Sequence, residues 1–167
     1  MSVRQEGTAV CPGSYDPVTN GHLDIIGRAA RVFDRVIVGV VNQPLRKNKT
    51  LFSPEERQAF IEAATSEQDN IEVQVFSTLL VDFAREHNAR AIVKGLRAIS
   101  DFEYEFEMNQ LNRQLAEDIE SVFILASPGY SFIRSSGVKE IAAFGGDVSE
   151  LVPPHVASAL SERAQRD

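Results

Sequence analysis

The chain has 167 residues, of which 43% are hydrophobic and 25% charged, and its net charge is −7. This length predicts one domain, residues 1–167, with a full hydrophobic core. The acidic balance disfavours a general nucleic-acid-binding protein, and no apolar stretch reaches the roughly 20 residues of a membrane span. A single cysteine, Cys11, excludes an intrachain disulfide, and the first residues lack the apolar core of a signal peptide, so we expect a cytoplasmic protein.

The first strand and the first helix are joined by a connection rich in glycine and proline. Residues 8–11 form an apolar run that predicts the strand, and an amphipathic pattern beginning at His22 predicts the helix. We expect the two glycines and two prolines of residues 12–21 to keep this connection out of regular structure. His22 then lies at a helix start, where unpaired N–H groups and the positive end of the helix dipole favour a phosphate.

A second strand and a basic loop follow. Residues 35–41 are nearly all apolar and β-branched, which is typical of a parallel strand buried on both faces. The loop of residues 42–50 holds three of the 17 basic residues and leaves the carboxyl end of this strand. We therefore expect the loop to face a ligand, the alternative being a solvated surface loop. Ser53 is predicted to cap the next helix, with Pro54 in its first turn and Glu56 closing a capping box.

The middle of the chain continues the alternation of strands and helices. Residues 71–76 alternate between apolar and polar, which predicts a strand exposed on one face. Residues 91–93 are predicted as the fourth strand, with residues 94–97 as the loop that follows it. Helices are predicted over residues 79–87 and 102–115.

The last third of the chain supplies the fifth strand and the final helices. Residues 121–125 predict the strand, and residues 130–138 connect it to a short helix over residues 138–144. Gly145 and Gly146 stop that helix. Pro153 and Pro154 begin a last helix.

The repeated strand–helix pattern predicts an α/β fold of the doubly wound, Rossmann-like class. Right-handed crossovers would give a five-stranded parallel sheet of order 3-2-1-4-5 with helices on both faces. The order reverses between strands 1 and 4, and ligands bind outside the carboxyl ends of the strands at such a point. The connection at residues 12–22 and the loop at residues 94–97 are therefore expected to meet at one crevice.

The first connection holds four polar or nucleophilic candidates. His22 is expected to donate from Nε2–H to a phosphate oxygen, the alternative being a histidine that faces solvent at a helix start. Ser14 adds a hydroxyl and a backbone donor to the same anion, or else serves only as a turn residue. Asp16 is interpreted as a carboxylate that fixes the loop rather than a metal ligand, and Cys11 as a buried small residue rather than a nucleophile.

Two later segments extend the predicted anion site. Lys94 ends an apolar strand, where a lysine usually reaches solvent, but the Gly95-Leu96-Arg97 sequence after it favours a phosphate clamp. The hydroxyl residues of segment 130–138 precede a helix, where they either cap it or donate to phosphate oxygens. No cluster of carboxylates, or of histidine and cysteine, has metal-ligand spacing, so Mg²⁺ is expected to enter with a nucleotide, held by phosphates and water.

The chain as a whole resembles the bacterial phosphopantetheine adenylyltransferase family. Residues Thr19-Asn20-Gly21-His22 match the Thr/His-x-Gly-His motif of the nucleotidyltransferase superfamily to which this family belongs. That motif marks only the superfamily. The segments Lys94–Arg97, 101–105 and 130–133 are more specific to the family. The resemblance extends over essentially the whole sequence.

The resemblance implies a set of ligand contacts. Those to ATP are Ser14, Tyr15, His22, Gly95, Leu96, Arg97, Glu105, Tyr130, Ser131, Phe132, Ile133, Arg134, Ser135 and Ser136. Those to the phosphopantetheine substrate are Ser14, Arg46, Leu80 and Lys94. The chain departs from the family pattern in having Ser14-Tyr15 for Thr-Phe, Arg46 for lysine and Arg134 for serine, and its basic loop looks about two residues longer. Lys47 or Lys49 is therefore an alternative to Arg46.

The implied reaction joins ATP and 4′-phosphopantetheine to give dephospho-coenzyme A and pyrophosphate, a step of coenzyme A biosynthesis. The nucleophile is the phosphate of the substrate, which is mostly dianionic at neutral pH because its second pKa is about 6. Neither a protein base nor a covalent intermediate is then required. His22 would stabilise charge at the α-phosphate in an in-line attack, Lys94 and Arg46 would hold the attacking phosphate, and Arg97, Ser135 and Ser136 would steady the triphosphate.

Two other functions compete with this reading. A related nucleotidyltransferase would act on nicotinate mononucleotide or an alcohol phosphate, and a non-enzymatic module would bind ATP without releasing pyrophosphate. The resemblance further implies a homohexamer. Coenzyme A is a candidate inhibitor, and neither nucleic acid nor a membrane is an expected partner.

Overall fold

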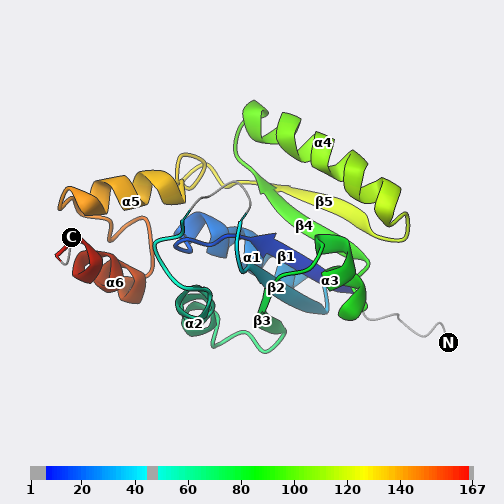
Figure 1. Ribbon diagram of the computed structural model, residues 1–167, viewed down its shortest axis with the longest axis horizontal. Helices are drawn as coiled ribbons and strands as arrows, with labels where there is room; N and C mark the ends of the chain where they lie inside the picture. Colours follow the sequence, from blue (N-terminus) through cyan, green and yellow to red (C-terminus); the bar gives the residue numbers. More distant parts are fainter. Residues whose placement is uncertain (1–6, 45–48, 166–167) are drawn as a thin grey trace.

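A five-stranded parallel sheet forms the centre of the computed structural model, which describes residues 7–44 and 49–165 (Figure 1). The strand order is β3-β2-β1-β4-β5, and every neighbouring pair is parallel. The predicted fold class and strand order are therefore confirmed. The strands are β1 (Thr8–Gly13), β2 (Arg35–Val41), β3 (Ile71–Phe76), β4 (Ala91–Leu96) and β5 (Glu120–Leu125).

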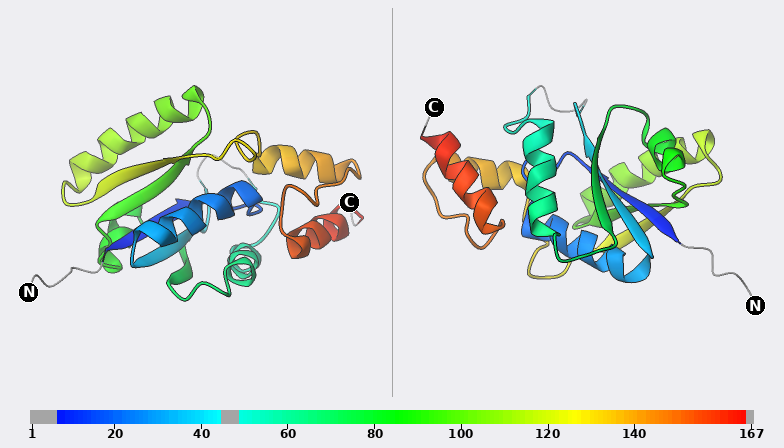
Figure 2. Two further views of the ribbon diagram at one scale, coloured as in Figure 1. Left: turned by 180° about the vertical axis from the view of Figure 1, so that it is seen from behind. Right: turned by 90° about the horizontal axis from the view of Figure 1, so that it is seen from below.

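Helices cover both faces of the sheet, as predicted. The helices α1 and α2 lie on one face and α3 and α4 on the other, while α5 and α6 pack on each other at the end of the molecule far from the start of β1 (Figures 1 and 2). Within the described residues, no helix is long and apolar enough to cross a lipid bilayer. The helices are α1 (Asn20–Val32), α2 (Pro54–Ala64), α3 (Leu80–Glu86), α4 (Ile99–Leu115), α5 (Ser135–Ala143) and α6 (Pro154–Ala164).

Alternate residues of the central strands enter two separate hydrophobic clusters. Ala9 and Cys11 of β1 pack with α1, α2 and α5, whereas Val10 packs on the opposite face with α3. This period of two explains the nearly unbroken apolar runs in the sequence, because a strand covered on both faces buries every side chain. Burial of a valine or isoleucine side chain contributes about 1.5–3 kcal/mol. Cys11 is buried, as predicted, and burial raises the pKa of its thiol to about 12.

The first connection is more regular than the sequence indicated. Pro12 and Gly13 belong to β1 and pair with β2, and Gly21 lies in α1. The prediction that residues 12–21 avoid regular structure was therefore right for residues 14–19 and wrong for the residues on either side of them. Proline is tolerated in β1 because the pairing of β1 with β4 ends at Val10, so no partner on that side needs an N–H from Pro12.

Three elements begin or end three residues away from the predicted position. Lys94, Gly95 and Leu96 continue β4, paired with β5, instead of forming a loop. The cross-strand pairing overrides the local preference of a lysine and a glycine for a strand end. The helices α4 and α5 each begin three residues earlier than expected, at Ile99 and Ser135. The predicted capping box of α2 is confirmed, with Ser53 and Glu56 bonded reciprocally.

Candidate active site

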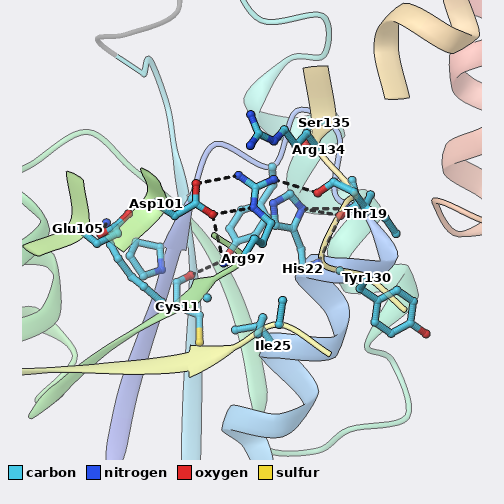
Figure 3. A pocket seen from close by; sticks show the side chains of 18 of the residues that line it. Cys11, Thr19, His22, Ile25, Arg97, Asp101, Glu105, Tyr130, Arg134 and Ser135 are labelled. Atoms are coloured by element: carbon cyan, nitrogen blue, oxygen red, sulfur yellow. Dashed lines mark hydrogen bonds and ion pairs between the residues drawn. The ribbon is translucent and has the colours of Figure 1, made fainter. Parts of the chain in front are cut away.

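A cavity of about 540 Å³ opens where β1 and β4 separate. These strands share only two residue pairs, at Ala9 and Val10, whereas β1 shares six pairs with β2 and β4 shares six with β5. Beyond Val10 the two strands diverge toward their carboxyl ends, and the cavity is lined by residues of both strands together with α1, α4 and the start of α5 (Figure 3). The crevice lies at the reversal of strand order, where the sequence predicted it.

Most of the expected ligand contacts line this cavity. They are Tyr15, His22, Lys94, Gly95, Arg97, Glu105, Tyr130, Ile133, Arg134, Ser135 and Ser136. Lining residues that the sequence analysis did not assign to ligands include Thr19, Ile25, Ser100, Asp101 and Tyr104. The structure thus brings together groups from the first, fourth and fifth strand–helix connections, of which the first and the fifth are separated by more than a hundred residues of chain.

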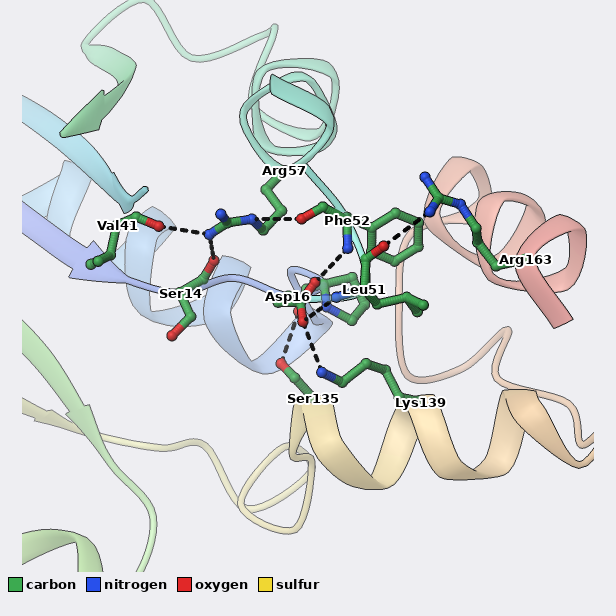
Figure 4. A network of polar contacts seen from close by, with 10 residues as sticks. Ser14, Asp16, Val41, Leu51, Phe52, Arg57, Ser135, Lys139 and Arg163 are labelled. Carbon is green, nitrogen blue, oxygen red and sulfur yellow. Dashed lines mark hydrogen bonds and ion pairs between the residues drawn. The ribbon is translucent and has the colours of Figure 1, made fainter. Parts of the chain in front are cut away.

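The other expected contacts lie outside the cavity lining. Leu96 is buried, Phe132 and Ser131 are exposed, and Leu80 begins α3 against the second hydrophobic cluster. Ser14 gives its carbonyl to Arg57, while its hydroxyl points away from that contact (Figure 4). Arg46 and Lys47 fall outside the described residues. Lys49 is described and exposed.

His22 is fixed by a capping box at the start of α1. Its backbone N–H donates to Oγ1 of Thr19 at 3.3 Å, and its ring Nδ1 accepts the backbone N–H of Thr19 at 3.1 Å. Since Nδ1 is the acceptor, the neutral ring carries its proton on Nε2. The capping contact therefore selects the tautomer that can donate a hydrogen bond to an anion, and it holds the ring at the cavity wall.

Tyr15 packs against His22 on the same wall of the cavity. Its φ of 48° lies in the left-handed region, its ring meets His22 edge-on with centroids 5.0 Å apart, and its hydroxyl donates to the Cys11 carbonyl at 3.0 Å. A Cβ on Gly13 would come within 2.9 Å of the Tyr15 ring, so this position requires glycine. Burial raises the pKa of Tyr15 well above its ordinary value, which keeps the phenol neutral.

Two cations stand on the opposite wall, each beside a carboxylate of α4. The Lys94 ammonium is 2.8 Å from Glu105, and Nε of Arg97 donates to Asp101 at 3.0 Å. Arg97 also donates to the carbonyl of Ile133 at 2.9 Å, which ties β4 to the segment before α5. Burial alone would raise the pKa of Asp101, but hydrogen bonds and charge from Arg97 hold it below its ordinary value.

The third part of the lining is the first turn of α5. Arg134 is the N-cap residue and makes no side-chain cap, so the first backbone N–H groups of α5 lack a capping side chain. The Ser135 hydroxyl donates to the Pro17 carbonyl at 2.8 Å. Ser135 can therefore offer an anion its backbone N–H, while Ser136 offers both N–H and an exposed hydroxyl.

A buried polar network supports the first wall from behind (Figure 4). Asp16 has no exposed surface and accepts hydrogen bonds from the N–H groups of Leu51 and Phe52 at 3.0 and 2.9 Å and from Lys139 at 2.8 Å. Asp16 thus fixes a loop, as predicted. Burial alone would raise the pKa of Asp16, but these hydrogen bonds hold it below its ordinary value.

Arg57 completes this network and was not foreseen from the sequence. It is fully buried and donates to four backbone carbonyls, those of Ser14, Val41, Asn42 and Phe52. Burial lowers the pKa of its guanidinium from the ordinary value. One sequence feature points to this role, because Arg57 lies four residues before Ile61 and so on the buried side of α2.

The described residues contain no group of three or more histidine, cysteine, aspartate or glutamate side chains able to hold a metal ion. The carboxylates that line the cavity, Asp101 and Glu105, are each engaged by a cation.

Comparison with known proteins gives one family match and several close relatives. Residues 10–141 match the cytidylyltransferase-like family. The chain is 49% identical to the phosphopantetheine adenylyltransferase of Clostridium tetani over 93% of this chain and 96% of the relative. It is 52% identical to the enzyme of that name from Alkaliphilus metalliredigens, over 93% and 98%, and 53% identical to that from Rubrobacter xylanophilus, over 92% and 93%.

A solved structure shares the fold. A Vibrio parahaemolyticus protein assigned as a nicotinate-nucleotide adenylyltransferase superposes with a TM-score of 0.70 over 97% of this chain and 96% of its own. Its sequence identity is 17%, so the similarity concerns the fold alone.

Proposed function

The chain belongs to the cytidylyltransferase-like family and, within it, to the phosphopantetheine adenylyltransferases, and we propose that the cavity between β1 and β4 is where it transfers the adenylyl group. The chain is a nucleotidyltransferase that joins ATP and 4′-phosphopantetheine to give dephospho-coenzyme A and pyrophosphate. The observation that carries the proposed site is the convergence of His22, Lys94 and the start of α5 on one cavity at the strand reversal.

The attacking group is the phosphate of 4′-phosphopantetheine. With a second pKa of about 6 it is mostly dianionic at neutral pH, so the site needs no general base. Lys94 holds this phosphate and offsets its repulsion from ATP, and Arg46, Lys47 or Lys49 assists from the loop after β2. Glu105 lies 2.8 Å from Lys94 before the phosphate arrives, so substrate binding exchanges one anionic partner of Lys94 for another.

Charge that develops at the α-phosphate is stabilised by His22. The neutral ring donates from Nε2, because Nδ1 is occupied by the backbone N–H of Thr19. The first turn of α5 and Arg97 hold the phosphates that leave as pyrophosphate. The rate enhancement then comes from in-line positioning and from donors fixed before the reaction starts.

Mg²⁺ enters this scheme as part of the substrate, in the complex MgATP. Because the described residues offer no cluster of three or more metal-binding side chains, phosphate oxygens and water supply the ligands of the ion. We place the enzyme in the cytoplasm, in keeping with its single, buried cysteine.

Pyrophosphate release tests the function. Purified protein with MgATP is assayed with 4′-phosphopantetheine, nicotinate mononucleotide, an alcohol phosphate or no acceptor. We expect pyrophosphate and an equal amount of dephospho-coenzyme A with 4′-phosphopantetheine only. Faster release with another acceptor would reassign the substrate, and ATP binding without release would indicate a non-enzymatic module.

We further propose that the protein is a homohexamer in which α4 lies at a subunit interface. No residue of α4 is buried. Phe102 and Phe106 of this helix are apolar, yet they are 51% and 53% exposed, and their rings stack on each other. Adjoining exposed aromatic side chains on one helix are typical of an association surface. Light scattering should give six times the mass of one chain, and Phe106→Glu should reduce it, whereas Val32→Glu on α1 should not.

Coenzyme A is the candidate regulatory ligand. Coenzyme A contains the adenylyl and pantetheine parts of the product, so we expect it to inhibit in competition with both substrates. Inhibition that is competitive with neither would place its site elsewhere.

A further inference from the structure

The ion pair between Asp16 and Lys139 links the loop after β1 to α5, and neither residue lines the cavity. Asp16 has no exposed surface, and Lys139 keeps about a quarter of its side-chain surface exposed. Both carboxylate oxygens of Asp16 are already occupied, one by the N–H of Phe52 and the other by Leu51 and Lys139. Asp16 can therefore act on a ligand only through the segments that it holds.

Two contacts from α5 reach the same short segment. Ser135 donates to the carbonyl of Pro17, and Lys139, one helical turn later, pairs with Asp16. Residues four apart lie on the same side of a helix, so the two contacts fasten one side of the first turns of α5 to residues 16 and 17 (Figure 4). Arg134 and Ser136 meanwhile belong to the cavity lining.

The fastened segment leads directly to the catalytic histidine. Only Val18 lies between Pro17 and Thr19, which caps α1 and holds the ring of His22. The position of α5 relative to residues 16 and 17 therefore sets the position of its N-terminal amides relative to His22. These are the two groups that the proposed function assigns to the terminal phosphates and to the α-phosphate.

Apolar packing alone does not fix this relation. The side chains of Val138 and Ala142 bury α5 against the core, but hydrophobic contacts are not directional. A charge-assisted hydrogen bond is directional, and at the buried Asp16 it is protected from solvent screening. The packing holds α5 on the molecule, and the ion pair adds, with the Ser135 hydrogen bond, a directional contact that restricts rotation of the helix about its axis.

From this geometry we propose that Asp16 and Lys139 are positioning residues that hold the N-terminal turn of α5 in place for the terminal phosphates of ATP. The proposal rests on the adenylyl-transfer function proposed above. It implies that losing the ion pair weakens the interaction with the β- and γ-phosphates and leaves the adenosine and phosphopantetheine parts of the site unchanged.

The test compares Lys139→Met and Lys139→Arg with wild type, using calorimetric titration with MgATP and with AMP. We expect Lys139→Met to weaken MgATP binding about 10-fold, equivalent to about 1.4 kcal/mol, with AMP binding and the KM for 4′-phosphopantetheine within about twofold. Lys139→Arg should restore MgATP binding to within about threefold. Lys139→Gln serves as the second unpaired variant should Lys139→Met fold poorly.

Arg163→Met is the matched control. Arg163 of α6 donates to the carbonyl of Leu51, next to the amides that Asp16 binds, and to Glu56, and it does not line the cavity. We expect it to lower the melting temperature without changing MgATP affinity. Equal weakening of MgATP and AMP in Lys139→Met, no weakening of either, or the same effect in Arg163→Met would overturn the positioning role.

The two proposals fail in different ways. The binding titrations need no acceptor, so they report on Asp16 and Lys139 even if the acceptor is not 4′-phosphopantetheine. Conversely, wild-type protein that forms dephospho-coenzyme A while Lys139→Met binds MgATP normally would leave the function standing and remove the positioning role alone.

Discussion

The two walls of the cavity are held in different ways. The wall formed by β1 and α1 is supported from behind by buried groups, with Asp16 and Arg57 making hydrogen bonds to four separate segments. The wall formed by β4 and α4 is held by ion pairs that solvent reaches, those of Lys94 with Glu105 and of Arg97 with Asp101. None of the residues of α4 itself is buried.

This difference separates two requirements of the proposed reaction. A donor that stabilises the transition state must be fixed before the reaction, because reorganisation during catalysis costs rate. His22 on the first wall meets this condition. The cations of the second wall must exchange a carboxylate for a substrate phosphate, which a partly solvated ion pair permits at low cost. Substitutions on each wall test whether the two walls differ in this way.

The largest effect is expected at His22. Removal of one preorganised donor costs roughly 10²- to 10³-fold in kcat, so His22→Ala should lose turnover on that scale while keeping its fold. His22→Gln can retain the capping box but lacks the ring Nε2–H, and we expect a comparable loss. The measurement is steady-state pyrophosphate release by variants of matched circular dichroism.

His155→Ala is the control for this prediction. His155 also lies in the first turn of a helix, and its Nε2 contacts the carbonyl of Phe60 away from the cavity. It should leave kcat within about twofold. Near-normal turnover in His22→Ala would remove His22 from the mechanism.

The next effect concerns the buried support of the first wall. Asp16→Asn leaves one acceptor oxygen for three converging donors, so it should lower the free energy of unfolding by about 3 kcal/mol at neutral pH. Since the pKa of Asp16 is lower in the folded than in the unfolded state, this contribution is complete above about pH 5. It is lost as the pH falls below the ordinary value of 3.8.

Urea denaturation of wild type and Asp16→Asn between about pH 3 and pH 7, at one protein concentration, measures this difference. A difference that grows as the pH falls would contradict the assignment, because it would mean that Asp16 is protonated more readily in the folded protein.

An intermediate effect is expected from Lys94. Lys94→Met removes the charge that we propose holds the attacking phosphate, and we expect the KM for 4′-phosphopantetheine to rise about 10- to 100-fold with the KM for ATP nearly unchanged. Lys94→Arg should retain most of the affinity. Arg85→Met, which breaks a solvent-exposed ion pair with Asp118 remote from the cavity, should change neither constant.

The smallest effect on the free energy of unfolding is expected from breaking an ion pair of the second wall. Asp101→Asn breaks its ion pair with Arg97, which is partly solvated, and should lower the free energy of unfolding by less than about 1 kcal/mol. The same urea denaturation series compares it with Asp16→Asn. Equal losses for the two variants would show that the walls are not held differently.

The sequence predicts much of this arrangement because the relevant patterns are local. Runs of apolar residues, or of alternating apolar and polar residues, predict the strands. The alternation of strands with helices predicts the sheet order and the reversal between β1 and β4. The capping box of Ser53 and Glu56 is readable for the same reason. That His22 and Lys94 line the same cavity then follows from the topology and not from either motif alone.

The buried network is less accessible from sequence because its partners are distant. Lys139 and Asp16 are separated by 123 residues, and nothing in the segment around Lys139 distinguishes it from a surface lysine. Arg57 binds backbone carbonyls, which every residue possesses, so no partner residue type identifies it. The extension of β4 through Lys94 and Leu96 likewise depends on its pairing with β5.

A crystal structure with dephospho-coenzyme A bound tests the central claim most directly, because the product joins the two substrates at the reacting phosphate. The claim is that the cavity between β1 and β4 is the site of adenylyl transfer. We predict that the two linked phosphates lie within hydrogen-bond distance of Nε2 of His22 and of the Lys94 ammonium. A product molecule bound elsewhere, or one whose phosphates contact neither residue, would contradict the account.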